Sequence, residues 1–310
     1  MSGPAVVGGA ARPDRAGAGD GTLAGMRAAT PAQICRSRRI RLAMTVALIL
    51  VTYSHWPQKL IDSVEQSGIK VKWYIHHHGT EEKFIERLRG LEGKINVSLY
   101  FHMKNRGLSR SWNDGLIVAY HEGAEYALIV NDDLHFVDGG FAKFIEFARC
   151  VDNLGICYTM GLEIGDSLIA GSVVQQGMAC AIITPNAIGQ VGYFDTNFAP
   201  AYYEDMDYNL RASRLDVVIV THRETLVEHD RSTTTRTNPV IKEKISDIMH
   251  LNRDYFERKW NVFDRDYGRF GGQIPFKTPF NDPRFGLHIA WEVRDNPYPG
   301  YEQGLNDKSR

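Results

Sequence analysis

Short apolar runs alternate with amphipathic stretches between residues 45 and 135. The runs are rich in β-branched residues and predict strands at Val46–Thr52, Val71–Ile75, Val97–Phe101 and Tyr126–Val130. The stretches between them predict helices at Pro57–Gln66, Thr80–Leu91 and Ser109–His121. Strands that are apolar throughout and alternate with helices are typical of a parallel sheet covered on both faces. This half of the chain therefore predicts an α/β fold.

The second half has a less regular pattern. It predicts helices at Gly139–Cys150, Pro185–Gln190, Glu204–Arg214 and Val240–Trp260. Shorter apolar runs predict strands at Ala179–Ile183 and Val217–Val220, and a loop rich in aromatic residues is predicted at Gly192–Tyr203. No internal repeat is apparent, so we expect a single domain over residues 44–262.

The two ends of the chain differ from this domain in composition. Residues 1–43 are rich in Gly, Ala and Arg without apolar periodicity, which predicts a disordered tail. Residues 263–310 are dense in Gly, Pro, Asp and aromatic residues, and we expect an irregular extension packed on the domain.

An arginine cluster at Arg36, Arg38, Arg39 and Arg41 precedes the apolar run Leu42–Val51. The run is too short to span a bilayer, which takes about 20 residues, and no transmembrane segment is predicted elsewhere. A weak contact of the cluster with an anionic surface is compatible with the sequence, and so is a solvated tail. We expect a cytoplasmic protein and leave a peripheral membrane contact open.

Composition narrows the class of protein only slightly. The chain is 43% apolar with a net charge of −1, which is typical of a globular protein and predicts no strong attraction to polyanions. Its cysteines show no metal-type or dithiol spacing: Cys35, Cys150, Cys157 and Cys180. They fit a reducing compartment, with at least three of them acting as small buried apolar side chains.

The chemistry of the chain is concentrated where the strand Tyr126–Val130 ends. Asn131, Asp132 and Asp133 follow it directly, and ligands of parallel sheets bind beyond the carboxyl ends of the strands. Adjacent carboxylates repel each other, and a divalent cation with oxygen ligands would compensate them. The alternative is a polar turn, because Asn and Asp are common turn residues.

Several motifs, in order along the chain, resemble the family 2 glycosyltransferases, which have the GT-A nucleotide-diphospho-sugar fold. They are Asn105–Gly107 with Ser111–Gly115, Asn131–Asp133 as a DxD-type motif, Gly192–Asp195, Tyr203–Asp207 with Arg211, His229, and Tyr255–Trp260. The resemblance covers residues 45–260. It implies a Rossmann-like, mostly parallel sheet with helices on both faces.

The resemblance also implies an activity, the transfer of a sugar from a nucleotide-diphospho-sugar to an acceptor hydroxyl, with inversion. It assigns Asp133 and His229 to a Mn²⁺ or Mg²⁺ ion and Asp205 to the general base. Donor and nucleotide contacts are implied for Thr52, Tyr53, His77, Asn105, Asn113, Asn131, Asp132 and Arg211. The acceptor or sugar wall is implied for Gln176, Gly177, Tyr203 and Glu204.

Each of these assignments has a structural alternative that the sequence does not exclude. The acids at 204–207 also suit the first turn of a helix, where they compensate the dipole. Arg211 is as well explained by a salt bridge, and His229 by a neutral polar role. Tyr53 could equally belong to the scaffold.

The sequence departs from the family after the second strand. The usual Asp-Asn-Gly-Ser-x-Asp block is replaced by His77–Glu82, so His77 stands where the base-contacting Asp is expected. A UDP-sugar is the default donor, but the nucleotide base is open, as is a small metal site at residues 76–78. The acceptor is also open: a glycan, a protein or a modified nucleobase. The competing functions are a non-catalytic nucleotide-sugar- or glycan-binding module and a nucleotidyltransferase on the same fold.

Overall fold

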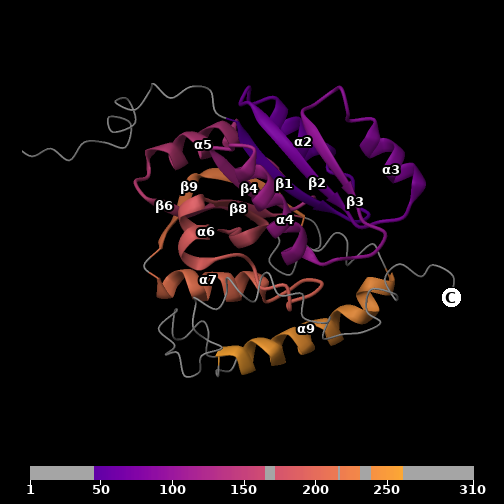
Figure 1. The fold of residues 1–310 in the computed structure, drawn as a ribbon. Helices are drawn as coiled ribbons and strands as arrows, with labels where there is room; N and C mark the ends of the chain where they lie inside the picture. Colours follow the sequence, from indigo (N-terminus) through magenta and orange to yellow (C-terminus); the bar gives the residue numbers. More distant parts are fainter. Residues whose placement is uncertain (1–44, 165–171, 216, 231–238, 261–310) are drawn as a thin grey trace, which may run out of the picture. The chain divides into compact units, whose positions relative to one another are not determined.

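A computed structural model describes residues 45–164, 172–215, 217–230 and 239–260 of the chain (Figure 1). The predicted tail at residues 1–43 and the predicted extension at 263–310 lie outside these ranges, so both stay predictions.

The first half alternates strand and helix as the apolar pattern predicts. Its elements are β1 (Val46–Thr52), α2 (Gln58–Glu65), β2 (Val71–His77), α3 (Glu82–Arg89), β3 (Val97–Phe101), α4 (Leu108–His121) and β4 (Tyr126–Val130). The strands β1, β3 and β4 have the predicted bounds, whereas β2 runs two residues further, to His77.

The second half contains both expected and unexpected elements. Its helices are α5 (Gly140–Cys150), α6 (Pro185–Val191), α7 (Glu204–Arg214) and α9 (Pro239–Trp260), close to the predicted ranges. Its strands are β5 (Leu134–Phe136), β6 (Leu154–Glu163), β7 (Val173–Gln175), β8 (Cys180–Ile183) and β9 (Val218–His229), with a 3-10 turn at Gly177–Ala179.

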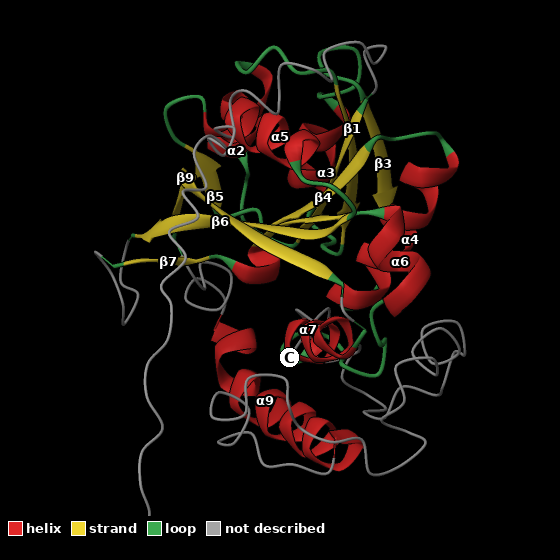
Figure 2. Cartoon of the chain, turned by 90° about the vertical axis from the view of Figure 1, so that its left-hand side faces the viewer, coloured by secondary structure: helices red, strands yellow, loops and turns green. Residues whose placement is uncertain are grey.

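The described strands form one sheet in the order β3-β2-β1-β4-β8-β6-β9-β5, and β7 pairs with β6 outside this path. β1 is parallel to both β2 and β4, β2 is parallel to β3, and β6 is parallel to β9. Antiparallel pairs join β4 to β8, β8 to β6, and β9 to β5. The predicted α/β class with helices on both faces of the sheet is confirmed (Figure 2).

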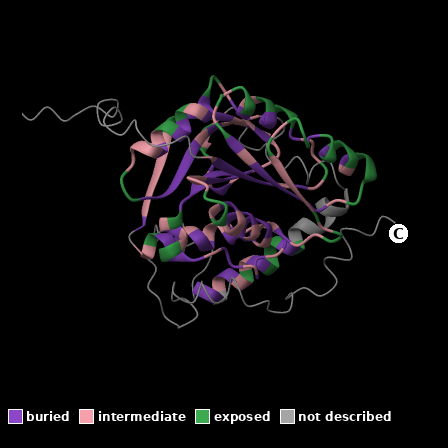
Figure 3. Cartoon of the chain, turned by 45° about the horizontal axis from the view of Figure 1, so that its top comes forward, coloured by how far each residue is buried: buried purple, intermediate pink, exposed green. Residues whose placement is uncertain are grey.

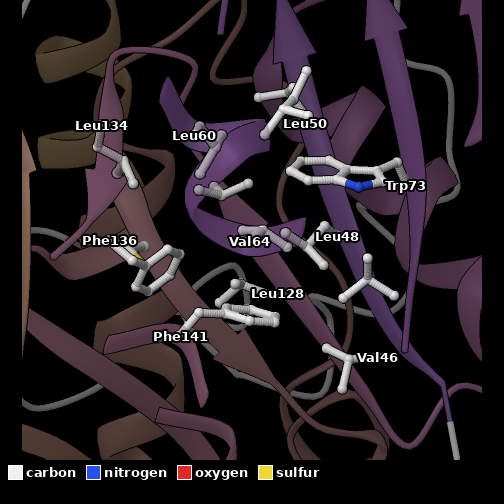
Figure 4. Packing of buried hydrophobic residues seen from close by; sticks show 14 of the residues in the cluster. Val46, Leu48, Leu50, Leu60, Val64, Trp73, Leu128, Leu134, Phe136 and Phe141 are labelled. Atoms are coloured by element: carbon white, nitrogen blue, oxygen red, sulfur yellow. The ribbon is translucent and has the colours of Figure 1, made fainter. Parts of the chain in front are cut away.

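Alternate residues of β1 supply the two apolar layers, because side chains of a strand point to opposite faces in turn. Val46, Leu48 and Leu50 pack with α2, α3 and α5 on one face (Figure 4). Ala47 and Ile49 pack with α4, α6 and α7 on the other. The central strand β1 is buried along almost its whole length, whereas outer helix surfaces are exposed (Figure 3), which explains why β1 is continuously apolar.

The apolar pattern missed β6, a strand inside the sheet. Its Gly155, Thr159, Gly161 and Glu163 interrupt the apolar run, and Gly weakens the strand signal. Both glycines lie where another side chain fills the space. A Cβ on Gly155 would meet Val217, and one on Gly161 would meet Gln176. β9 is also longer than predicted, because the polar stretch after Val220 continues the strand past a register shift between Thr159 and Met160 of β6.

The cysteines differ among themselves. Cys157 and Cys180 are free and buried, as expected for small apolar side chains. Cys150 is half-buried, and Cys35 lies outside the described residues. None of the described helices combines the length and apolarity that a bilayer crossing requires.

Candidate functional site

The turn after β4 lies beside the end of β9. β5 pairs antiparallel with β9 so that Leu134 lies opposite His229, and the amide of Asp230 donates to the carbonyl of Asp133 at 2.9 Å. The amide of Asn131 donates to the carbonyl of Ala179 at 2.9 Å. These backbone bonds hold the predicted DxD-type turn against a strand far away in the sequence.

Asp133 and His229, the two residues that the resemblance assigns to a metal ion, are in contact. Asp133 Oδ1 lies 3.0 Å from His229 Nε2, and the side chains are 8% and 5% exposed. This hydrogen-bonded pair is therefore largely shielded from water.

The neighbouring acid, Asp132, lies in the same turn. Burial, and then the charge of Asp133, raise the pKa of Asp132 well above its ordinary value. A cation bound beside the two carboxylates would lower that pKa and offset their repulsion.

A chain of hydrogen bonds continues from His229 into the protein interior. His229 Nδ1 lies 2.5 Å from Gln176 Oε1, and Gln176 Nε2 donates to Glu163 Oε1 at 2.9 Å. Gln176 is 4% exposed and Glu163 is 0% exposed. Gln176, predicted to line the sugar wall, therefore lies beneath His229. Gly177 has open space at its Cβ position and remains at the surface of the site.

The pair fits a divalent cation that takes its other ligands from elsewhere. Two ligands about 2.1 Å from one ion and at right angles to each other lie about 3.0 Å apart, and carboxylate and imidazole both suit Mn²⁺. The described residues contain no group of three His, Cys, Asp or Glu side chains that could hold a metal. The described residues therefore give no support to a metal site at residues 76–78.

The predicted base lies at the start of α7. Glu204, Asp205 and Asp207 occupy its first turn, after Tyr202 and Tyr203, which have positive φ angles of 79° and 71°. Asp205 is half-buried and accepts a hydrogen bond from the amide of Met206 at 2.8 Å. Glu204 is buried, and its pKa is raised first by burial and then by the charge of Asp205.

The tyrosine turn is tied to α9. Asn252, which is 0% exposed, donates from Nδ2 to the carbonyls of Ala201 at 2.8 Å and Tyr202 at 3.1 Å. Because positive φ is unfavourable for residues other than Gly, the surrounding structure must hold this conformation. Asn252 is a positioning residue that the sequence pattern did not reveal.

The other motif residues of this region form a buried ionic network. Lys259 Nζ lies 2.8 Å from Asp195 Oδ2 and 2.7 Å from Asp207 Oδ1. Arg211 pairs with Asp207 at 3.0 Å, and Trp260 Nε1 donates to Asp207 at 2.9 Å. Arg211 is 1% exposed and also donates to the carbonyl of Val191, so its guanidinium is engaged within the protein rather than presented to a diphosphate.

The predicted nucleotide contacts at the end of β1 and β2 differ in exposure. Thr52 Oγ1 lies 3.0 Å from His77 Nδ1, and these residues are 1% and 0% exposed. His77 stacks on Phe84 with ring centroids 4.6 Å apart, and burial lowers its pKa to about 4. Tyr53 is half-buried. Of the three residues predicted to contact the nucleotide here, it alone has a side chain that is partly exposed.

The two predicted asparagines join α4 to its surroundings. Asn105 Oδ1 accepts from the amide of Gly107 at 2.9 Å and lies 3.1 Å from His78 Nδ1. Asn113 is 5% exposed. Its Nδ2 donates to the carbonyl of Phe194, and its Oδ1 accepts from the amide of Phe194, each at 2.9 Å. Both side chains thus have structural partners, and His78, which departs from the family pattern, supplies one of them.

Comparison with solved structures identifies the fold. The sequence matches no protein-family model and no curated protein. The structure is similar to GalNAc-T7 with UDP, GalNAc and Mn²⁺, with a TM-score of 0.50, 11% identity, and coverage of 79% of this chain and 54% of that chain. The chain therefore spans about half the length of that protein.

Two further similar structures have lower scores. Mannosyltransferase PcManGT from Pyrobaculum calidifontis, in complex with GDP-Man and Mn²⁺, has a TM-score of 0.49, 11% identity, and coverage of 79% of this chain and 72% of that one. S. aureus TarS 1-349 with UDP-GlcNAc has a TM-score of 0.48, 12% identity, and coverage of 80% and 79%. The chain has the GT-A fold of glycosyltransferases, and its place in family 2 stays a prediction.

Proposed function

We propose that the protein is a metal-dependent, inverting glycosyltransferase that moves a sugar from a nucleotide-diphospho-sugar to an acceptor hydroxyl. The observation that carries the proposal is the contact between Asp133 and His229 at the carboxyl end of β4. A fold alone hosts many functions, whereas this pair supplies what a leaving diphosphate requires. The acceptor can be a glycan, a protein or a modified nucleobase.

On the donor side, Asp133 and His229 would hold Mn²⁺ or Mg²⁺, which when bound stabilises the negative charge that develops on the diphosphate. Asn131 and Asp132 would face the ribose or the sugar. Tyr53 would contact the base, with Thr52 and His77 supporting it from beneath. UDP is the default nucleotide.

On the acceptor side, Asp205 would accept the proton of the attacking hydroxyl. A carboxylate at a helix start is a suitable general base when it can reach that hydroxyl. Attack on the anomeric carbon from the face opposite the leaving diphosphate inverts its configuration, as in inverting glycosidases. Gly177, Tyr203 and Glu204 would form the wall beside the sugar.

The test is to incubate the protein with Mn²⁺, and separately with Mg²⁺, and a panel that includes UDP-GlcNAc, UDP-GalNAc and GDP-mannose. Donor hydrolysis or transfer is followed by NMR, and binding by calorimetry. Asp133→Ala should reduce turnover by about a thousandfold or more, because the metal site contributes several kcal/mol to the transition state. The exposed Asp62 offers a matched Asp62→Ala control.

The base is tested separately with Asp205→Asn. General-base catalysis contributes about 10²–10⁴-fold, so transfer should fall by that factor while the affinity for the donor is unchanged. Near-normal transfer would refute the role of Asp205. Donor binding without turnover in the unaltered protein would instead indicate a nucleotide-sugar-binding module.

A further inference from the structure

The imidazole of His229 lies between two hydrogen-bond acceptors. Asp133 Oδ1 is 3.0 Å from Nε2, and Gln176 Oε1 is 2.5 Å from Nδ1. A neutral imidazole carries one proton, so one ring nitrogen donates while the other presents a lone pair. Only an Nε2 lone pair can bind a cation beside Asp133.

The orientation of the Gln176 amide is fixed by its other partners. The amide nitrogen lies 2.9 Å from Glu163 Oε1 and 3.2 Å from the carbonyl of Val174, and neither a carboxylate nor a carbonyl oxygen can donate. The NH₂ group must therefore point toward them, which leaves Oε1 facing His229. Glu163, at the buried end of this chain of hydrogen bonds, therefore determines the direction in which each group donates.

The sheet builds this arrangement directly. Glu163 of β6 lies opposite His229 of the parallel strand β9. Gln176, which directly follows β7, is held against β6 by a hydrogen bond from its backbone amide to the carbonyl of Thr159 at 3.0 Å. Gly161 makes room for the amide, because a Cβ there would lie 2.3 Å from Gln176 Nε2. A buried acid of this kind is costly and would not be needed for packing alone.

We propose that Glu163 and Gln176 are positioning residues that hold the Nδ1 proton of His229 and thereby keep its Nε2 lone pair directed at a divalent cation beside Asp133. The inference rests on the proposed function and adds residues that contact neither donor nor metal. Partners of this kind orient metal-binding histidines, and their loss typically costs 10- to 100-fold in metal affinity.

Glu163→Gln tests the polarity without changing the shape. A glutamine at 163 can donate as well as accept, so the Gln176 amide is free to turn over and present NH₂ to His229. We expect Mn²⁺ affinity, measured by EPR on the protein with the metal alone, to fall at least tenfold. The melting temperature without metal should remain close to that of the unaltered protein. Glu65→Gln is the matched control, because Glu65 also accepts one hydrogen bond, from Trp73 Nε1.

The double variant Glu163→Gln/Gln176→Glu exchanges the two side chains and restores the polarity. The carboxylate at 176 then accepts both from the amide at 163 and from His229 Nδ1, so Mn²⁺ affinity should return most of the way. Gly161→Ala provides an independent test, because it displaces the Gln176 amide and should weaken Mn²⁺ binding. Gly189→Ala, at a position with open space around its Cβ, should not.

The outcomes separate this inference from the proposed function. If Asp133→Ala and His229→Ala weaken Mn²⁺ binding but Glu163→Gln and Gly161→Ala do not, the positioning role is wrong and the metal site stands. If Glu163→Gln weakens binding and the exchange does not restore it, the polarity argument is overturned. If the unaltered protein does not bind Mn²⁺, the proposed metal site fails and the inference fails with it.

Discussion

Two acids in different parts of the protein have pKa values shifted in opposite directions. At the end of β4, burial and the charge of Asp133 raise the pKa of Asp132. Between α7 and α9, burial also acts to raise the pKa of Asp195, but Lys259 and several hydrogen bonds outweigh it, and the pKa is lowered. The α7–α9 region carries its own cation, Lys259, whereas the β4–β9 region is where we propose that a cation binds.

This difference separates two groups of motif residues. Asp195, Asp207, Arg211 and Lys259 all belong to segments that resemble glycosyltransferase motifs, yet they bind one another in the interior. Their charges balance, so the network requires no ligand. These residues fix the positions of α7 and α9 relative to each other. They affect the position of Asp205 only indirectly.

The largest effect that separates the two regions is expected for Lys259→Met. Removing this cation leaves Asp195 and Asp207 buried with less compensation, and breaking a buried ion pair from one side costs about 3–5 kcal/mol. Urea denaturation at neutral pH measures the loss in free energy of unfolding. The exposed Lys143→Met is the control and should cost little. A loss below about 1 kcal/mol for Lys259→Met would contradict a structural role for this network.

A smaller effect is expected for Asn252→Ala. The substitution leaves the carbonyls of Ala201 and Tyr202 without their amide donor, which costs about 1–3 kcal/mol for buried groups. Because the tyrosine turn precedes Asp205, we expect transfer to fall while Mn²⁺ affinity is unchanged. Asn186→Ala, which removes an exposed bond to the carbonyl of Asn153, is the matched control. Equal losses of transfer activity from both variants would show that Asn252 has no special role in positioning the tyrosine turn.

Apolar periodicity predicted the regular part of the fold. The run Val46–Thr52 is apolar throughout because both of its faces are buried, and the same holds for Tyr126–Val130. β6 escaped prediction because its glycines and Glu163 serve Gln176 and neighbouring segments rather than a sheet face. Its identity as a strand depends on tertiary contacts that a local pattern does not contain.

The candidate site was only partly predictable for a related reason. Residue type and position after a strand indicate Asp133, since ligands collect at that edge of a parallel sheet. Local sequence gives no sign of Glu163 or Asn252, because each acts on a residue more than ten positions away. For the same reason, the local sequence gives no sign that Gln176 pairs with His229.

The smallest expected effect concerns pH, and it has opposite signs in two acids of the α7–α9 region. Glu204 has a raised pKa, so the unfolded chain ionises first, near pH 4.3, and Glu204 then destabilises the folded state as pH rises toward the folded-state pKa. Asp195 has a lowered pKa, so it stabilises the folded state above about pH 3.9 and loses that effect as pH falls through the folded-state pKa.

Glu204→Gln should therefore raise the free energy of unfolding, on the order of 1 kcal/mol at pH 8, with little change at pH 4. Asp195→Asn should lower it at pH 8, and this loss should shrink toward pH 3. Denaturation curves of both variants across this range measure the two slopes. Slopes of the same sign would mean that Lys259 does not distinguish the environments of these acids. The α7–α9 network would then not be charge-balanced as described, and its contrast with the proposed cation site would be wrong.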